Sequence, residues 1–165
     1  MSVIKNTPPP ISVLVFGGVT DKFNKYKQVS NLNEACGILI GTHSVDESKI
    51  TITLATEPDC NDKRSRFAFK IKSNKHNKTL QNRFTKSGNR EVYLGTWHTH
   101  PEDHPTPSKR DTDDWLKQYY INRNLFESML FTIVGIKTNK WFLVNDNGIF
   151  VLDSNLIHHV KEEIV

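Results

Sequence analysis

The sequence predicts a single α/β domain, and three observations support this prediction. The chain has 165 residues, enough for one domain to bury a sizeable core without help from disulfides. Apolar runs of strand length alternate with segments whose apolar residues repeat every three or four positions, as on an amphipathic helix. No repeat, low-complexity tract or linker interrupts the pattern. We therefore expect one domain over residues 1–165, with residues 1–10 flexible.

The first elements are a strand, a helix and a second strand. Residues 11–16 form a short apolar run that predicts a strand. Apolar residues then recur at spacings of four and three, which predicts a short amphipathic helix behind Thr20 or Asp21. Residues 34–41 are an apolar run that begins with a glutamate, and we expect them to form a buried strand.

The middle of the chain predicts a strand pair and a longer helix. A turn separates residues 34–41 from the apolar residues 50–55, which predicts that the two runs pair. Residues 66–71 alternate basic and apolar side chains, as a half-exposed strand does. A helix is expected over residues 73–86, ending at Gly88.

The last third of the chain completes the sheet around one more helix. Residues 92–100 predict a strand, which Pro101 ends because proline removes a donor from the sheet ladder. Ser108 then begins a helix. Three further strands are expected, over residues 129–136, 141–144 and 149–152.

Charge is distributed unevenly along this chain of net charge +4. Residues 63–90 contain no acidic residue, whereas residues 102–114 carry five acidic residues and two basic ones. Such a basic block can bind nucleic acid, dock an acidic protein partner or simply be solvated. Its few aromatic residues offer no stacking platform, so we do not expect nucleic acid to bind it. The ten basic residues are Lys63, Arg64, Arg66, Lys70, Lys72, Lys75, Lys78, Arg83, Lys86 and Arg90.

Composition argues against membrane and secreted classes. No apolar stretch approaches the roughly 20 residues that a membrane span requires, and the first residues lack the pattern of a secretory signal. The two cysteines, Cys36 and Cys60, are not expected to form a bridge, because Cys36 lies within an apolar strand. We therefore expect a cytoplasmic protein.

Two histidines and an aspartate predict a metal site. Residues two apart on a strand point to the same face, with Cβ atoms roughly 6.6 Å apart, so His98 and His100 can reach one ion. Asp111 lies in the first turn of the helix that Ser108 begins. Two imidazoles and one carboxylate leave a tetrahedral zinc ion with one open position, where the pKa of a water falls to about 7.

Two further residues are candidates for the chemistry. Glu34 begins an apolar strand, where a carboxylate is costly unless paired, and it could serve as the general base. Ser108 could donate a hydrogen bond to the oxyanion of a tetrahedral intermediate. Purely structural roles stay open for these residues, since Ser108 and Asp111 also fit a capping box and Glu34 could pair with a lysine.

These residues resemble the JAB/MPN metalloproteases, whose zinc motif, JAMM, combines a strand glutamate, His-x-His-Pro and Ser-x-x-Asp. Here the motif reads Glu34, His98-Thr-His100-Pro101 and Ser108-Lys-Arg-Asp111, with no element missing. Stretches 55–58, 64–67, 96–102 and 104–108 further resemble stand-alone bacterial JAB proteins encoded beside conjugation enzymes in antiphage operons of the CBASS type.

The resemblance implies a cytidine-deaminase-like α/β fold, with a curved central mixed sheet flanked by helices. It implies one Zn²⁺ per chain, held by His98, His100 and Asp111, and hydrolysis just after the C-terminus of a conjugated protein. That partner would be the C-terminal tail of a nucleotide cyclase or a ubiquitin-like protein. Two alternatives remain, a JAB peptidase of another conjugation system and a non-catalytic MPN binding module.

Other enzyme classes fit the sequence less well. Cytidine deaminases require His-x-Glu and Pro-Cys-x-x-Cys, and neither is present. Amidohydrolases carry His-x-His inside a barrel of about 250 residues, and this chain is too short for one. Cys36 lies two residues after Glu34 and could face the same site, but no dedicated histidine marks it as a nucleophile.

Overall fold

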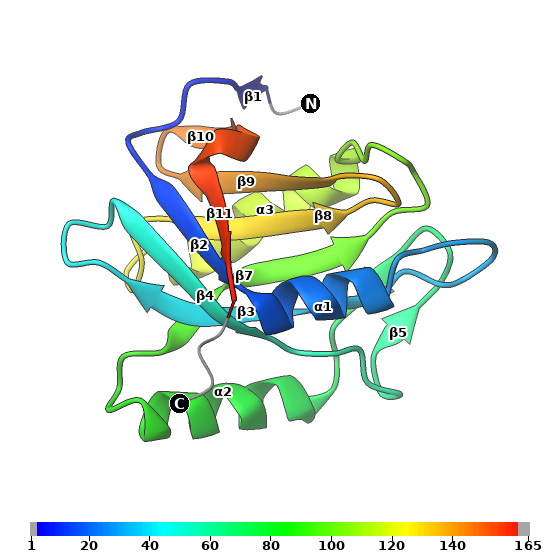
Figure 1. Cartoon of the computed structure of the whole chain (residues 1–165), viewed down its shortest axis with the longest axis horizontal. Helices are drawn as coiled ribbons and strands as arrows, with labels where there is room; N and C mark the ends of the chain where they lie inside the picture. Colours follow the sequence, from blue (N-terminus) through cyan, green and yellow to red (C-terminus); the bar gives the residue numbers. More distant parts are fainter. Residues whose placement is uncertain (1–2, 162–165) are drawn as a thin grey trace.

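A nine-stranded mixed sheet organises the chain in the computed structural model, which describes residues 3–161 (Figure 1). The strand pairs β1–β10, β7–β8, β2–β4 and β2–β11 are parallel, and the other neighbours are antiparallel. In spatial order the strands are β1 (Ile4–Lys5), β10 (Gly148–Leu152), β9 (Asn139–Asn145), β8 (Met129–Val134), β7 (Val92–Thr99), β3 (Cys36–His43), β4 (Lys49–Ala55), β2 (Ser12–Phe16) and β11 (Ile157–Val160).

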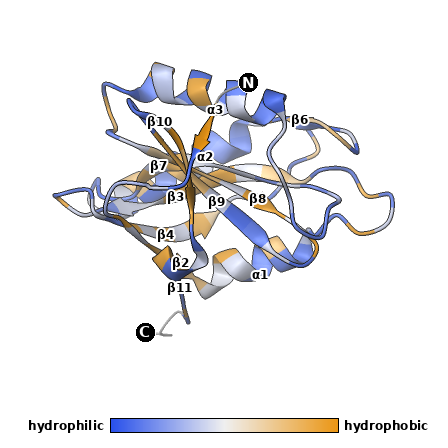
Figure 2. Ribbon diagram, turned by 90° about the horizontal axis from the view of Figure 1, so that it is seen from above, coloured by the Kyte–Doolittle hydropathy of each residue, from blue (hydrophilic) through white to orange (hydrophobic). Residues whose placement is uncertain are grey.

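Helices cover both faces of this sheet, and each face has its own core (Figure 2). On one face α1 (Gly17–Lys25) packs Phe23 against Trp97, with ring centroids 5.2 Å apart. On the other face α3 (Lys109–Asn122) packs Trp115 against Phe131, with ring centroids 5.3 Å apart. The third helix, α2 (Asn74–Lys86), contacts β7 and β3. None of the described helices is long and apolar enough to cross a membrane.

Strand β3 is central to the site because it lies between β4 and β7 and pairs antiparallel with both. Its register shifts on either side of Ile40, and such bulges bend and twist a strand. Gly37 allows a close backbone approach, since a Cβ there would lie 2.1 Å from the Thr56 carbonyl oxygen. The strongly curved mixed sheet with flanking helices confirms the predicted fold class.

Most expected elements are present, and the differences have local causes. β3 begins at Cys36, so Glu34 precedes the strand that we expected it to begin. α1 begins at Gly17, ahead of the expected start at Thr20 or Asp21. The prediction of a strand over residues 66–71 is wrong. Only a two-stranded ribbon forms there, from β5 (Lys63–Arg64) and β6 (Phe69–Lys70), and the Phe67 side chain between them is 71% exposed.

Both edges of the sheet carry strands that the sequence patterns do not predict. We expect residues 1–10 to be flexible; residues 1–2 lie outside the described residues, and β1 pairs with β10 along one edge. β11 follows the short 3-10 helix Ser154–Leu156 and pairs with β2 at the other edge. Each of these edge strands spans four residues or fewer, too short for periodicity to reveal.

Candidate metal centre

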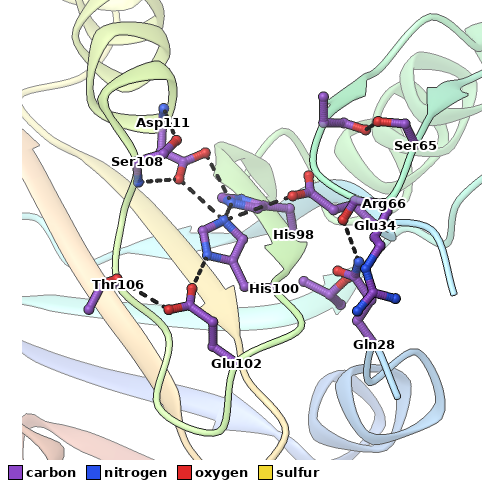
Figure 3. Close-up of polar contacts among 12 residues, drawn as sticks. Gln28, Glu34, Ser65, Arg66, His98, His100, Glu102, Thr106, Ser108 and Asp111 are labelled. Carbon is purple, nitrogen blue, oxygen red and sulfur yellow. Dashed lines mark hydrogen bonds and ion pairs between the residues drawn. The ribbon is translucent and has the colours of Figure 1, made fainter. Parts of the chain in front are cut away.

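Strand β7 presents the two histidines from the middle of the sheet. His98 lies opposite Cys36 on β3 and Ile133 on β8, and its side chain is 1% exposed. The His100 amide donates to the Val134 carbonyl at 3.0 Å, so the backbone stays extended past the end of the strand. The two rings therefore face the same side, with their Nε2 atoms 3.1 Å apart (Figure 3).

Helix α3 brings Asp111 to these rings through its N-terminal cap. Ser108 Oγ accepts from the Asp111 amide at 3.1 Å, and Asp111 Oδ2 accepts from the Ser108 amide at 2.7 Å, which completes a capping box. The same carboxylate lies beside the histidines, with Oδ1 3.2 Å from His98 Nε2 and Oδ2 3.3 Å from His100 Nε2. The cap and the site are therefore one arrangement, in which the cap orients the carboxylate.

The spacing of these three side chains fits a tetrahedral metal ion. Their donor atoms all lie within 4.8 Å of one another, and the closest pairs are 3.1–3.3 Å apart. Ligands at zinc bond lengths of about 2.0–2.2 Å would lie roughly 3.3–3.5 Å apart in a tetrahedron. Two imidazole nitrogens and one carboxylate also match the ligand chemistry of zinc. His98, His100 and Asp111 could thus hold one ion and leave a position open.

The surroundings shift the pKa values of all three groups. Burial alone would lower the pKa of His100, but the hydrogen bonds with Asp111 and Glu102 raise it, so this ring must release a proton that it holds more tightly than usual when it binds a metal ion. Burial lowers the pKa of His98, which favours the neutral ring that binds metal. Burial alone would raise the pKa of Asp111, but hydrogen bonds with His100 and His98 outweigh it and hold that pKa well below its ordinary value. Asp111 is therefore an anion beside an uncharged imidazole.

Glu34 lies next to this cluster, and hydrogen bonds of its own backbone and of the next residue fix its position. Ala35 and Thr99 exchange hydrogen bonds at 2.9 and 3.0 Å, and the Glu34 amide donates to the Ser65 carbonyl at 2.8 Å. The Glu34 carboxylate is 4.0 Å from His100 Nε2, and the residue is 4% exposed. Burial raises the pKa of Glu34 to about 7, the range that suits a general base near neutral pH.

An open cleft of about 950 Å³ leads to these residues. The β5–β6 ribbon forms one wall, and the N-terminal half of α3 forms the other. Glu34, His100, Ser108 and Asp111 all line it, so the structure brings the predicted site residues to one solvent-accessible place, with His98 buried directly beneath. The ring of Phe69 packs on His98, with centroids 4.7 Å apart.

Comparison with known proteins identifies the family. Residues 18–145 match the family described as prokaryotic homologs of the JAB domain. The chain belongs to this JAB family. The CD-NTase/cGAS isopeptidase of Vibrio cholerae is 33% identical over 126 residues, which cover 76% of this chain and 77% of that protein. The CD-NTase/cGAS isopeptidase of Escherichia coli is 34% identical over the same shares of both chains.

A third relative and a solved structure extend the comparison. The CD-NTase/cGAS isopeptidase of Pseudomonas aeruginosa is 38% identical over 96 residues, covering 58% of this chain and 60% of that protein. The solution structure of protein DSY2949 from Desulfitobacterium hafniense superposes with a TM-score of 0.61 at 18% identity, over 93% of this chain and 94% of that one. The structural likeness supports the fold.

Glu102 is a site residue of this JAB chain that the sequence patterns did not reveal. Its Oε1 atom lies 2.9 Å from His100 Nδ1, and Thr106 Oγ1 donates to its Oε2 at 3.4 Å (Figure 3). His98 Nδ1, in contrast, is buried and has no hydrogen-bond partner among the described residues. The sequence gives one indication of this contact: Glu102 follows His100 by two residues, with Pro101 between them.

Cys36 is excluded as a nucleophile in the JAB site. It is completely buried, and burial raises the pKa of its thiol to about 12. A thiol that stays protonated at neutral pH is a poor nucleophile. Both Cys36 and the exposed Cys60 are free thiols.

Proposed function

We propose that this JAB protein is a zinc-dependent isopeptidase that hydrolyses the bond just after the C-terminus of a conjugated protein. One observation carries the proposal. His98, His100 and Asp111 converge at tetrahedral ligand spacing, with the buried carboxylate of Glu34 beside them, at an open cleft in a JAB chain. Three protein ligands and an adjacent acid are the arrangement of a catalytic metal site, whereas a structural zinc site is closed by four protein ligands.

The side chains divide the work of hydrolysis. Zinc, when bound, supplies Lewis-acid chemistry, lowering the pKa of a water molecule and polarising a carbonyl. Glu34 accepts the proton of the attacking water at its carboxylate and delivers it to the leaving amine as the C–N bond breaks. Ser108 Oγ accepts from the Asp111 amide, which leaves its hydroxyl hydrogen free to donate to the developing oxyanion.

The substrate that we propose is a CD-NTase joined through its C-terminus to another protein, as in CBASS defence. The three CD-NTase/cGAS isopeptidase relatives support this choice over other ubiquitin-like conjugation systems. An extended C-terminal tail could lie in the cleft between the ribbon and α3, held by main-chain hydrogen bonds. We place the reaction in the cytoplasm, where the two free thiols would stay reduced.

Purified protein is expected to contain about one zinc ion per chain and to cleave a CD-NTase conjugate only when zinc is present. Elemental analysis and a gel assay of a purified conjugate measure the two quantities. Chelation should abolish cleavage, and stoichiometric zinc should restore it. Zinc-loaded protein that leaves the conjugate intact would indicate the alternative, a non-catalytic binding module.

Glu102 is expected to strengthen zinc binding through His100. Its carboxylate accepts a hydrogen bond from Nδ1–H, which leaves the Nε2 lone pair for the ion, and losing such a partner typically weakens metal affinity about 10–100-fold. Glu102→Ala should show that loss in a chelator competition, and Glu102→Gln, whose amide oxygen still accepts, should recover part of it. Asp103→Ala, next in the chain but paired with Lys137, is the control. Equal zinc affinity in all three variants would contradict the role.

A further inference from the structure

The basic block of residues 63–90 divides into residues that have partners within the chain and residues that do not. Lys75 pairs with Asp59 at 3.2 Å, and Arg83 pairs with Glu91 at 2.7 Å. Arg66 donates to the Ser30 carbonyl at 2.6 Å. These contacts explain part of the positive charge as ordinary structural pairing.

Three lysines in or just after the β5–β6 ribbon lack such pairing. Lys63 and Lys70 occupy facing register positions on the two strands, where like charges are destabilising. Lys72 follows two residues later, and its pKa is lowered by the charges of Lys63 and Lys70. Within residues 3–161 none of the three forms an ion pair with a carboxylate. Lys63, Lys70 and Lys72 are therefore exposed cations that repel one another.

A buried network keeps the ribbon in place despite this repulsion. Asp62 Oδ1 accepts from the amides of Lys72 and Ser73 at 2.8 and 2.9 Å, and its Oδ2 lies 2.7 Å from His76 Nε2. Asp62 directly precedes β5, and Lys72 follows β6, so one side chain closes both ends of the segment. Asp62 therefore fixes the position of the ribbon that carries the lysines.

The opposite wall of the cleft also carries two cations. Arg110 and Lys117 of α3 line the cleft that Lys63 and Lys70 line from the ribbon, and neither forms an ion pair in the described part of the chain. The two walls stand on either side of the site residues (Figure 3). The acidic residues that line the cleft lie at or near the metal centre: Glu34, Glu102, Asp111 and Asp114. The ribbon side of the cleft is therefore positive, and α3 adds two cations on the facing side.

We infer that these two walls bind an acidic segment of the substrate protein, with Lys63 and Lys70 as the principal contacts and Arg110 and Lys117 facing them. The inference rests on the proposed isopeptidase function and adds a sequence preference to it: carboxylates close to the scissile bond. A peptide fits better than a nucleic acid, because the cleft leads to groups suited to amide hydrolysis. The ring of Phe69, one of the few aromatic residues of the block, also packs against the ring of His98.

The first test measures binding to the full, zinc-loaded Glu34→Gln variant, in which hydrolysis should be at least about 10²–10⁴-fold slower. A labelled glutamate-rich peptide is expected to bind at least about tenfold more tightly than its glutamine counterpart. The difference should shrink as salt rises, because exposed charges are screened. Equal affinity for the two peptides would overturn the inference, and so would tighter binding of a single-stranded oligodeoxynucleotide.

The second test reverses the charges. Lys63→Glu and Lys70→Glu made together leave a like-charged pair in register, so no new bond forms between the strands. Wild-type protein should cleave an internally quenched isopeptide with a glutamate-rich tail better than one with a lysine-rich tail, and the double variant should prefer the lysine-rich tail. The change should lie in KM, with kcat little altered. Lys78→Glu, on α2 away from the cleft, should retain the wild-type preference.

The outcomes separate the two proposals. Cleavage of both tails with equal kcat/KM would refute the charge preference and leave the isopeptidase function standing. No cleavage of any conjugate, together with charge-selective peptide binding that the double variant reverses, would refute the isopeptidase function and retain the acidic-partner surface. Thermal unfolding of the double variant close to that of Lys78→Glu would show that both are folded.

Discussion

Replacing Glu34 with glutamine is expected to lower kcat at least about 10²–10⁴-fold and to leave the zinc content unchanged. The carboxylate is close to His100 Nε2 but, at 4.0 Å, outside the cluster of three donors, so its loss should not release the ion. Glutamine keeps the volume of the side chain and cannot accept the proton of the attacking water. The measurements are elemental analysis and cleavage of a CD-NTase conjugate by both proteins at equal zinc loading.

Two controls accompany Glu34→Gln, one for the loss of a carboxylate and one for the stability of the fold. Glu57→Gln removes another carboxylate, which is partly exposed and pairs with Lys25, and it should retain wild-type turnover. A glutamine at residue 34 also removes a buried ionisable group, so the free energy of unfolding should not fall. Wild-type kcat in Glu34→Gln would remove this residue from the mechanism. Loss of zinc from the variant would instead identify Glu34 as a ligand.

The metal centre could be predicted because its geometry is local. Residues two apart on a strand share a face, and this alone brings His98 and His100 together. A serine followed three residues later by an acid marks a helix start, which places Asp111 at the first turn of α3. The capping box and the cluster with the histidines do not compete for this pair, since the capping bonds orient the carboxylate that meets the two rings.

What the sequence did not reveal depends on contacts between distant segments. Glu34 was predicted as the base, but the contacts that place it near His100 were not: Ala35 and Thr99, 64 residues apart, bond to each other. Glu102 reaches His100 only through the turn at Pro101, which no periodic pattern describes. A half-exposed strand was expected over residues 66–71, where the β5–β6 ribbon forms instead. The ribbon stands apart from the sheet because Phe67 and Phe69 line the cleft and belong to neither core cluster.

Asp111 is both a cap residue and a metal ligand, and this leads to a prediction in which two variants differ in zinc affinity. Asp111→Asn should bind zinc at least about 100-fold more weakly, a larger loss than removing a residue that only orients a ligand. Its side-chain oxygen can still accept from the Ser108 amide, so the helix cap should persist. The metal-free protein should nevertheless lose stability at neutral pH, because the folded site holds the pKa of Asp111 well below its ordinary value and the variant lacks that charge.

Ser108→Ala should retain most of the zinc affinity. It removes the Oγ atom that accepts from the Asp111 amide, and the metal-free protein should lose about 1 kcal/mol of stability, measured by chemical denaturation. Zinc affinity should fall far less than in Asp111→Asn, because all three donors remain. If Ser108 also donates to the oxyanion, kcat should drop about 10²–10³-fold at full zinc loading, and an unchanged kcat would restrict it to the cap. Equal zinc loss in the two variants would mean that the cap, and not the charge of Asp111, determines binding of the ion.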